Sequence, residues 1–189
     1  KMTPLRLIVE MLIATGARLN DLLALRWSDL DLSTSPATVT ISGTLVVDEH
    51  GKIVRQARPK TEKGYRTLSL PEWAADLLRE WRGLATDLRV FPSRAGTWLS
   101  AANVRRAFRE ALDGTPYAGW MFKDFRSGVA TRIERVLGVE EAARQLGLAI
   151  PTLCWRQGFE PSTSCMVCAV KVAGRSQMLP SCATPAAEG

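Results

Sequence analysis

Cysteine is absent from most of the chain, because its four cysteines, Cys154, Cys165, Cys168 and Cys182, all lie near the C-terminal end. This distribution excludes a disulfide framework through the whole fold. The sequence also lacks any apolar run that approaches the roughly 20 residues of a membrane-spanning helix. Its first residues, Lys-Met-Thr-Pro, lack the basic-then-apolar layout of a signal peptide. We therefore expect a cytoplasmic protein with no membrane partner.

Acidic residues are fewer than basic ones: 19 Asp and Glu against 25 Lys and Arg give a formal net charge of +6. A basic excess favours a polyanionic partner such as nucleic acid. The chain has 189 residues, of which 46% are hydrophobic and 23% charged, the balance of a globular domain with a real core. Disorder throughout the chain is thereby excluded.

Periodic apolar residues and turn signals predict a mainly α fold with a small three-stranded antiparallel sheet, an α+β class. The first helix spans 4–14, and a second begins near Leu19 and continues to Asp31. A strand with a glycine kink follows over 38–47, then a turn over 48–51, then two strands over 52–57 and 65–70 on either side of a basic tip at Pro59 to Gly64. The remaining elements are helices over 71–83, 100–112 and 139–146. In the first of these helices, Trp73 and Trp81 are expected to be core anchors rather than base-stacking platforms.

Arg18 is placed at the start of the second helix, directly after a break at Thr15-Gly16. Helix N-termini favour anions, so a cation there needs an anion or an acid beside it. Asp21 is the nearest acid in the sequence. The alternative is an exposed arginine at the head of an ordinary amphipathic helix.

A basic face is predicted on the 100–112 helix, where Val104, Phe108 and Leu112 share the apolar side. Three arginines, Arg105, Arg106 and Arg109, occupy the other side. Such a face is either simply solvated or contacts a phosphate backbone, and the sequence leaves both open.

Residues 15–31 read Thr-Gly-x-Arg-x-x-Asp-Leu-x-x-Leu-x-Trp-x-Asp-Leu-Asp. This order resembles the first box of the tyrosine recombinases, the phage integrase family, and the resemblance covers about Thr3 to Leu148. It implies the catalytic-domain fold of that family, in which the N-terminal DNA-clamping domain would be absent here. It also implies DNA recombination and integration at double-stranded attachment sites, by a homo-oligomer on DNA, without metal or other cofactor.

Two further stretches resemble the same family. Pro59-Lys60-Thr61 looks like the hairpin lysine, which can serve as general acid to a leaving 5′ hydroxyl, although a lysine on a turn is also a common surface residue. Lys123-Asp124-Phe125-Arg126 resembles the His-x-x-Arg box, with Lys in place of His. The resemblance implies that Arg18, Lys60, Lys123 and Arg126 form the catalytic set, in which two planar guanidinium groups clamp the scissile phosphate. The alternative for Arg126 is a helix cap or a pair with Asp124. Residues assigned to DNA binding are Lys63, Arg66, Arg105, Arg106 and Arg109.

The sequence departs from the family in two places. Leu146-Gly147-Leu148 stands where the family has Leu-Gly-His, and leucine cannot donate a hydrogen bond to phosphate. The only tyrosines, Tyr65 and Tyr117, precede Arg126, whereas the family nucleophile, which forms a 3′-phosphotyrosyl link, follows it. Whether the chain is an enzyme is therefore open, and the alternative is a non-catalytic DNA-binding remnant or regulator.

Residues 149–189 lack sustained periodicity and are expected to be irregular and unrelated to the family. A frameshift, or a reading across a gene junction, would produce such a boundary in one event. The competing hypothesis for the tail is a zinc site that includes Cys165 and Cys168, but a second tight ligand pair is missing.

Overall fold

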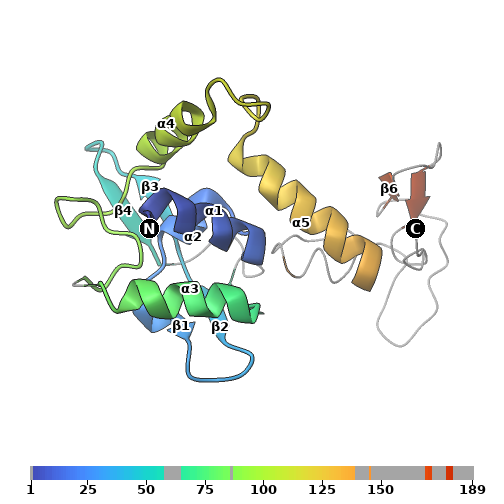
Figure 1. The fold of residues 1–189 in the computed structure, drawn as a ribbon, viewed down its shortest axis with the longest axis horizontal. Helices are drawn as coiled ribbons and strands as arrows, with labels where there is room; N and C mark the ends of the chain where they lie inside the picture. Colours follow the sequence, from blue (N-terminus) through green and yellow to red (C-terminus); the bar gives the residue numbers. More distant parts are fainter. Residues whose placement is uncertain are drawn as a thin grey trace. The chain divides into compact units, whose positions relative to one another are not determined.

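The computed structural model describes residues 2–57, 65–85, 87–138, 145, 169–171 and 178–180. The chain divides into two compact units, Lys1–Val129 and Ala130–Gly189. Figure 1 shows the elements of the first unit, in which small antiparallel sheets lie beside the helices. The mainly α class with a small sheet, expected from the sequence, is confirmed.

Helix α1 (Pro4–Thr15) forms as the sequence predicts. The side chain of Thr3 caps it by accepting a hydrogen bond from the Arg6 amide at 3.2 Å, and Pro4 takes the first turn. Gly16 ends it with a φ of 61°, a left-handed conformation that glycine adopts without steric cost. Its buried stripe includes Leu7, Ile8, Met11 and Leu12.

The second helix is much shorter than predicted. Helix α2 covers only Leu19–Leu23, and it is followed by the 3₁₀ turn η1 (Trp27–Asp29) and by strand β1 (Leu30–Asp31). The reason is competition for backbone hydrogen bonds. The Trp27 amide donates to the Leu88 carbonyl at 3.0 Å, and the Leu25 carbonyl accepts from the Val90 amide at 3.0 Å. These long-range bonds replace the next helical turn.

The predicted strand over 38–47 is two strands, β2 (Thr38–Ile41) and β3 (Thr44–Val47), which belong to different sheets. The two predicted strands that follow are β4 (Ile53–Gln56) and β5 (Arg66–Ser69). The three-stranded antiparallel sheet has the order β1-β2-β5, while β3 and β4 form a separate hairpin. The expectation that β4 and β5 pair around a common tip is therefore wrong.

Helices α3 (Glu72–Arg82), α4 (Ala101–Leu112) and α5 (Phe122–Leu137) complete the described helices. Trp81 is a core anchor as predicted, because its indole N–H donates to the Val90 carbonyl at 2.8 Å. Trp73 was expected to be a second anchor, but it lies exposed on α3. On α4, Val104 and Phe108 are buried as predicted, and Leu112 packs against the core.

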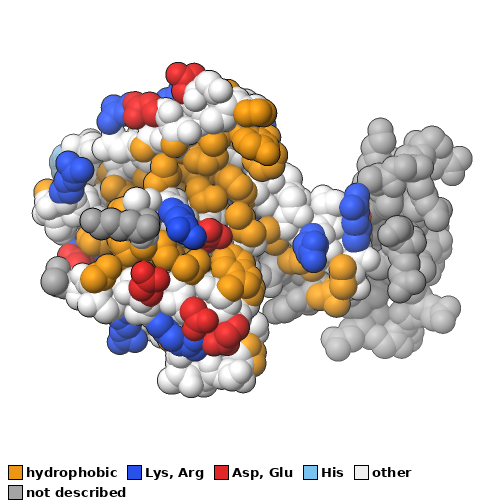
Figure 2. All heavy atoms as spheres, viewed as in Figure 1, with side chains coloured by type: hydrophobic (Ala, Val, Ile, Leu, Met, Phe, Trp, Pro, Cys, Tyr) orange, Lys and Arg blue, Asp and Glu red, His pale blue; other side chains and the backbone are white. Residues whose placement is uncertain are grey.

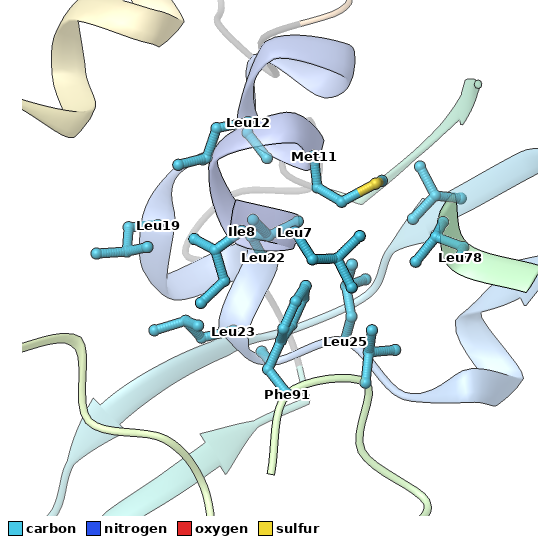
Figure 3. Packing of buried hydrophobic residues seen from close by; sticks show 14 of the residues in the cluster. Leu7, Ile8, Met11, Leu12, Leu19, Leu22, Leu23, Leu25, Leu78 and Phe91 are labelled. Carbon is cyan, nitrogen blue, oxygen red and sulfur yellow. The ribbon is translucent and has the colours of Figure 1, made fainter. Parts of the chain in front are cut away.

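The core lies between α1, α2 and the elements that pack on them. Figure 3 shows α1 side chains packed against Leu22 and Leu25 and against Phe91, which is almost fully buried. At the surface, Figure 2 shows that charges of both signs are interspersed with hydrophobic side chains on one face of the first unit. That face is therefore not uniformly basic, despite the net charge of +6.

In the second unit the described residues include an antiparallel pair, β6 (Ala169–Lys171) with β7 (Met178–Pro180). The tail therefore contains some regular structure where none was expected. The predicted helix over 139–146 lies outside the described residues except for Gln145, which is helical. Among the helices that the structure describes, none has the length and apolarity to span a membrane.

Candidate phosphate-binding site

Arg18 occupies the N-cap position of α2. Its carbonyl accepts hydrogen bonds from the amides of Asp21 and Leu22, both at 3.0 Å. Its side chain is 51% exposed, and the guanidinium lies 3.8 Å from the Asp21 carboxylate. Because α2 has only five residues, its dipole is small. The charge of Arg18 itself, rather than the helix end, is what would attract an anion.

The turn before Arg18 is fixed by local bonds. The Thr15 hydroxyl donates to the Met11 carbonyl at 2.6 Å and accepts from the Ala17 amide at 3.2 Å. Gly16, in its left-handed conformation, then presents its carbonyl to Arg126, which donates to it at 2.8 Å across 110 positions of sequence. The fold thus brings the first and third family-like boxes into contact.

Arg126 lies on α5, one turn after Phe122. Asp124, which the sequence offered as an alternative partner, accepts from the Met121 amide at 2.7 Å at the start of this helix. Together with Lys123, which precedes it on the same helix, Arg126 faces a cavity of about 580 Å³. This cavity also reaches the start of α2.

Five basic side chains line that cavity: Arg18, Arg105, Arg109, Lys123 and Arg126. Three of them belong to the catalytic set that the sequence predicts, and two belong to the predicted basic face of α4. We refer to this space as the basic cavity. These cations come from α2, α4 and α5, which are far apart in the sequence, so it is the fold that brings them together.

Two other predicted site residues, Arg106 and Arg66, do not line the basic cavity. Arg106 lines a separate cleft beside the start of α1, where it lies 3.9 Å from Glu110 and 3.3 Å from the Asn103 side-chain oxygen. Arg66 lies on β5 and is only 7% exposed. Lys60 and Lys63 lie outside the described residues.

The electrostatics of the site are dominated by burial. Desolvation and, after it, the charges of Arg18 and Arg66 lower the pKa of Arg126 to about 10, although the charge of Asp21 opposes them. Burial likewise lowers the pKa of Arg66, with Asp21 raising it and Arg18 lowering it. Three guanidinium groups therefore share the influence of one carboxylate, and the positive excess favours a bound anion.

Hydrophobic side chains form the rest of the cavity wall, and sequence reasoning missed them. Phe108 and Phe122 stack with ring centroids 4.4 Å apart, and Trp120 and Met121 line the cavity while remaining about half exposed. The run Trp120-Met121-Phe122 directly before the third box was the available signal. An apolar wall lowers the local dielectric constant, so it strengthens the attraction between the cations and an anion.

Neither tyrosine lines the basic cavity. Tyr65 is exposed just before β5. Tyr117 is also exposed, and its ring lies edge-on to Trp120 at 5.5 Å. Within the described residues no group of His, Cys, Asp or Glu could hold a metal ion, and the four cysteines lie outside them.

Comparison with known proteins agrees with this geometry. The model of the phage integrase family matches residues 1–148, and the chain belongs to this family. An integrase from Streptomyces ambofaciens is 32% identical over 161 residues, which cover 77% of this chain and 41% of that protein. The chain thus spans about two fifths of the relative's length.

The fold is that of tyrosine recombinases. The structure of the Tn1549 transposon integrase in complex with transposon right end DNA superposes with a TM-score of 0.61, at 15% sequence identity. The match covers 75% of this chain and 50% of that one.

The C-terminal part is similar to a different family. The model of a 2Fe-2S iron-sulfur cluster binding domain matches residues 138–189. The alpha subunit of an NADPH-Fe(3+) oxidoreductase from Geobacter sulfurreducens is 43% identical over 49 residues, which cover 26% of this chain and 6% of that subunit. The two family matches overlap over 138–148, the segment that contains Leu146-Gly147-Leu148.

Proposed function

We propose that the first unit binds duplex DNA through the scissile phosphate of a recombination site, as part of a site-specific recombinase. The observation that carries this proposal is the meeting of Arg18, Lys123 and Arg126 at one cavity. The family membership supports it, and so does the DNA-bound state of the Tn1549 integrase. We also propose that the protein acts in the cytoplasm and that several copies of it assemble on DNA.

In this function Arg18 and Arg126 would hold the two non-bridging oxygens of the phosphate. Their guanidinium groups stay charged at neutral pH and offer paired donors, so they can stabilise the charge of a pentacoordinate transition state. Lys123 would donate to one of these oxygens. Lys60 would give its proton to the 5′ oxygen as the phosphorus–oxygen bond breaks.

Around this centre Arg105 and Arg109 line the same cavity, so we assign them to the phosphates next to the scissile one. Lys63 and Arg106 are assigned to the flanking backbone. Such contacts supply affinity without sequence preference and weaken as salt rises.

A non-catalytic DNA-binding protein is the second candidate for the first unit. It is favoured by Leu148, which stands where the family has a phosphate-binding histidine, and by the positions of Tyr65 and Tyr117 outside the basic cavity. In the family, tyrosine attacks the phosphorus and forms a 3′-phosphotyrosyl link while the 5′ hydroxyl leaves. We propose that these 189 residues bind the phosphate but do not perform that attack.

One experiment tests binding and cleavage together. Gel-shift titration with duplex DNA should show an affinity that falls steeply between about 50 and 200 mM salt. Incubation with a nicked attachment site should trap no covalent protein–DNA adduct. Absence of binding at low salt would refute the DNA proposal. An adduct mapped to Tyr65 or Tyr117 would show that the chain performs the cleavage step.

For the second unit we propose a [2Fe–2S] site, with a domain boundary between residues 138 and 148 in place of a sharp one at 148. The match to the iron-sulfur family supports this proposal. So does the donor set, since Cys154, Cys165, Cys168 and Cys182 are four thiolates with one C-x-x-C pair. Four cysteine thiolates are the ordinary ligands of such clusters.

Metal and sulfide analysis of protein purified without oxygen separates this proposal from the zinc hypothesis. Two irons and two acid-labile sulfides per chain, with visible absorption that bleaches on reduction, are expected for the cluster. One zinc without sulfide would favour the zinc site instead. Replacing Cys165 with Ser should abolish the absorption, whereas Ser164→Ala, a matched neighbour, should keep it.

A further inference from the structure

Arg66 does not lie where a DNA contact would be expected. The sequence places it just after the basic tip, but the structure places it in β5, paired with Ile41 in the central strand β2. Ile41 is fully buried and Arg66 is 7% exposed. A guanidinium this deeply buried is rare unless other charges compensate it.

The compensating charges belong to the phosphate site. Asp21 is as buried as Arg66, and its negative charge raises the pKa of Arg66. The charge of Arg66 in turn lowers the pKa of Arg126. Arg66 is therefore within electrostatic reach of the carboxylate and both guanidinium groups of the site, although it does not line the cavity.

The shared carboxylate explains a feature of Arg18. Strong guanidinium–carboxylate pairs have N···O distances of about 2.7–2.9 Å, whereas Arg18 lies 3.8 Å from Asp21. A second cation that attracts the same carboxylate weakens its hold on the first. Arg18 thereby keeps its donors for a ligand.

We propose that Arg66 is a positioning residue: it shares Asp21 with Arg18, so that Arg18 remains available to phosphate, and it adds a third positive charge behind the Arg18–Arg126 pair. This inference rests on the proposed phosphate site. It replaces the assignment of Arg66 as a DNA contact. A buried residue acts on the phosphate through its electrostatic field and through Arg18, not by direct contact.

The test compares Arg66→Met, Arg66→Lys and a matched control, Arg55→Met. Arg55 is an arginine whose side chain is only 7% exposed; it pairs with Asp29 at 3.5 Å and does not line the basic cavity. Each variant is assayed for duplex DNA affinity, for the salt dependence of that affinity, and for the rise in melting temperature caused by sulfate, the probe anion. Circular dichroism checks that each variant is folded.

Arg66→Met is expected to bind DNA about tenfold more weakly, a loss consistent with a unit charge acting across a protein interior. It should also lose most of the sulfate-induced rise. Arg66→Lys, which keeps the charge, should bind within about threefold of wild type. Neither should alter the salt slope, which falls by about 1 when a direct phosphate contact is removed. Arg55→Met should lower the melting temperature but keep DNA affinity and the sulfate response.

Wild-type affinity and sulfate response in Arg66→Met would overturn the inference while leaving the phosphate site intact. A salt slope reduced by about 1 in either variant would make Arg66 a direct contact and would also overturn it. If Arg66→Met does not fold, Arg66→Lys decides: a folded lysine variant that has lost tenfold or more in affinity refutes the charge mechanism. Failure of the wild type itself to bind DNA would instead refute the proposed function.

Discussion

The guanidinium of Arg126 is partly buried beside two other arginines, and this placement is unfavourable for the unliganded protein. Desolvation and the charges of Arg18 and Arg66 lower its pKa to about 10. The opposing contributions are the attraction of Asp21 and the hydrogen bond to the Gly16 carbonyl. A site that binds phosphate by excess positive charge must carry this cost until its ligand arrives.

Replacing Arg126 with Met should therefore separate stability from binding. We expect the free energy of unfolding to stay unchanged or to rise by up to about 1 kcal/mol, because an apolar side chain of similar length removes a desolvated charge. DNA affinity should fall by more than tenfold, since a charge-assisted phosphate contact is lost. Urea denaturation and gel-shift titration measure the two quantities. A loss of stability above about 1 kcal/mol would show that Arg126 is mainly structural.

The same variant gives a pH dependence with a defined sign. Because the pKa of Arg126 is lowered to about 10 in the folded state and is higher in the unfolded chain, the unfolded chain binds more protons between these two values. The free energy of unfolding of the wild type should then rise relative to Arg126→Met as the pH increases through 10. Below that pH the difference should be constant. A wild-type free energy of unfolding that falls relative to Arg126→Met as the pH increases through 10 would contradict the lowered pKa of Arg126.

At the scale of elements, the hairpin β3–β4 is attached to the chain after α2 by a partly buried polar network. Arg55 donates to the Ala24 carbonyl at 2.9 Å and to the Ser42 hydroxyl at 2.5 Å. Ser42 in turn donates to Asp29 at 2.6 Å. Gly43 leaves room for this network, because a Cβ there would lie 2.7 Å from the Arg55 guanidinium carbon and from the Gln56 carbonyl oxygen.

Gly43→Ala is therefore expected to destabilise the protein by about 1–3 kcal/mol, the usual cost of overpacking a filled site. The backbone oxygen cannot move away as a flexible side chain would. Gly119→Ala is the matched control, because nothing lies within 4 Å of a Cβ at that position, and it should change the free energy by less than about 0.5 kcal/mol. Equal stability of the two variants, measured by thermal denaturation, would mean that the β3–β4 hairpin moves to accommodate the added methyl group at no cost in free energy.

The sequence predicts elements that depend on local bonds and fails to predict elements that depend on long-range bonds. Helices α1, α3 and α4 could be predicted because their caps and apolar periods are local. The end of α2 could not, since it depends on bonds to Leu88 and Val90, far along the chain. The sheet partners of β4 and β5 were missed for the same reason.

The candidate site divides in a similar way. Arg18 and Arg126 could be assigned by their motifs, and the fold brings them to one cavity. The burial of Arg66 was missed because a basic residue beside a basic turn resembles a surface residue until its strand is placed. Arg106 differs from Arg105 only by the direction it takes around α4, which the sequence does not specify closely enough.

At the scale of the molecule, the first unit holds the core. Within the part of the chain that the structure describes, every buried hydrophobic residue lies between Leu7 and Phe122. The compact division at Val129 follows the last of them, and α5 continues to Leu137. The match to the iron-sulfur family begins at residue 138. These boundaries indicate that the second unit is not needed for the core of the first.

A fragment that ends at Gly138 should therefore fold and bind DNA as the first unit does in the full chain. Its free energy of unfolding should lie within about 0.5 kcal/mol of the corresponding transition of the full chain, because no buried contact of the described core is removed. If the second unit holds the proposed cluster, removing its iron should leave that transition unchanged for the same reason. A fragment that ends at Gly119 is the control: it lacks Phe122, which stacks on Phe108 at 4.4 Å, and Arg126. That fragment should melt at a lower temperature and should lose DNA binding. If the longer fragment loses several kcal/mol, the second unit contributes to the core and the proposed boundary is wrong.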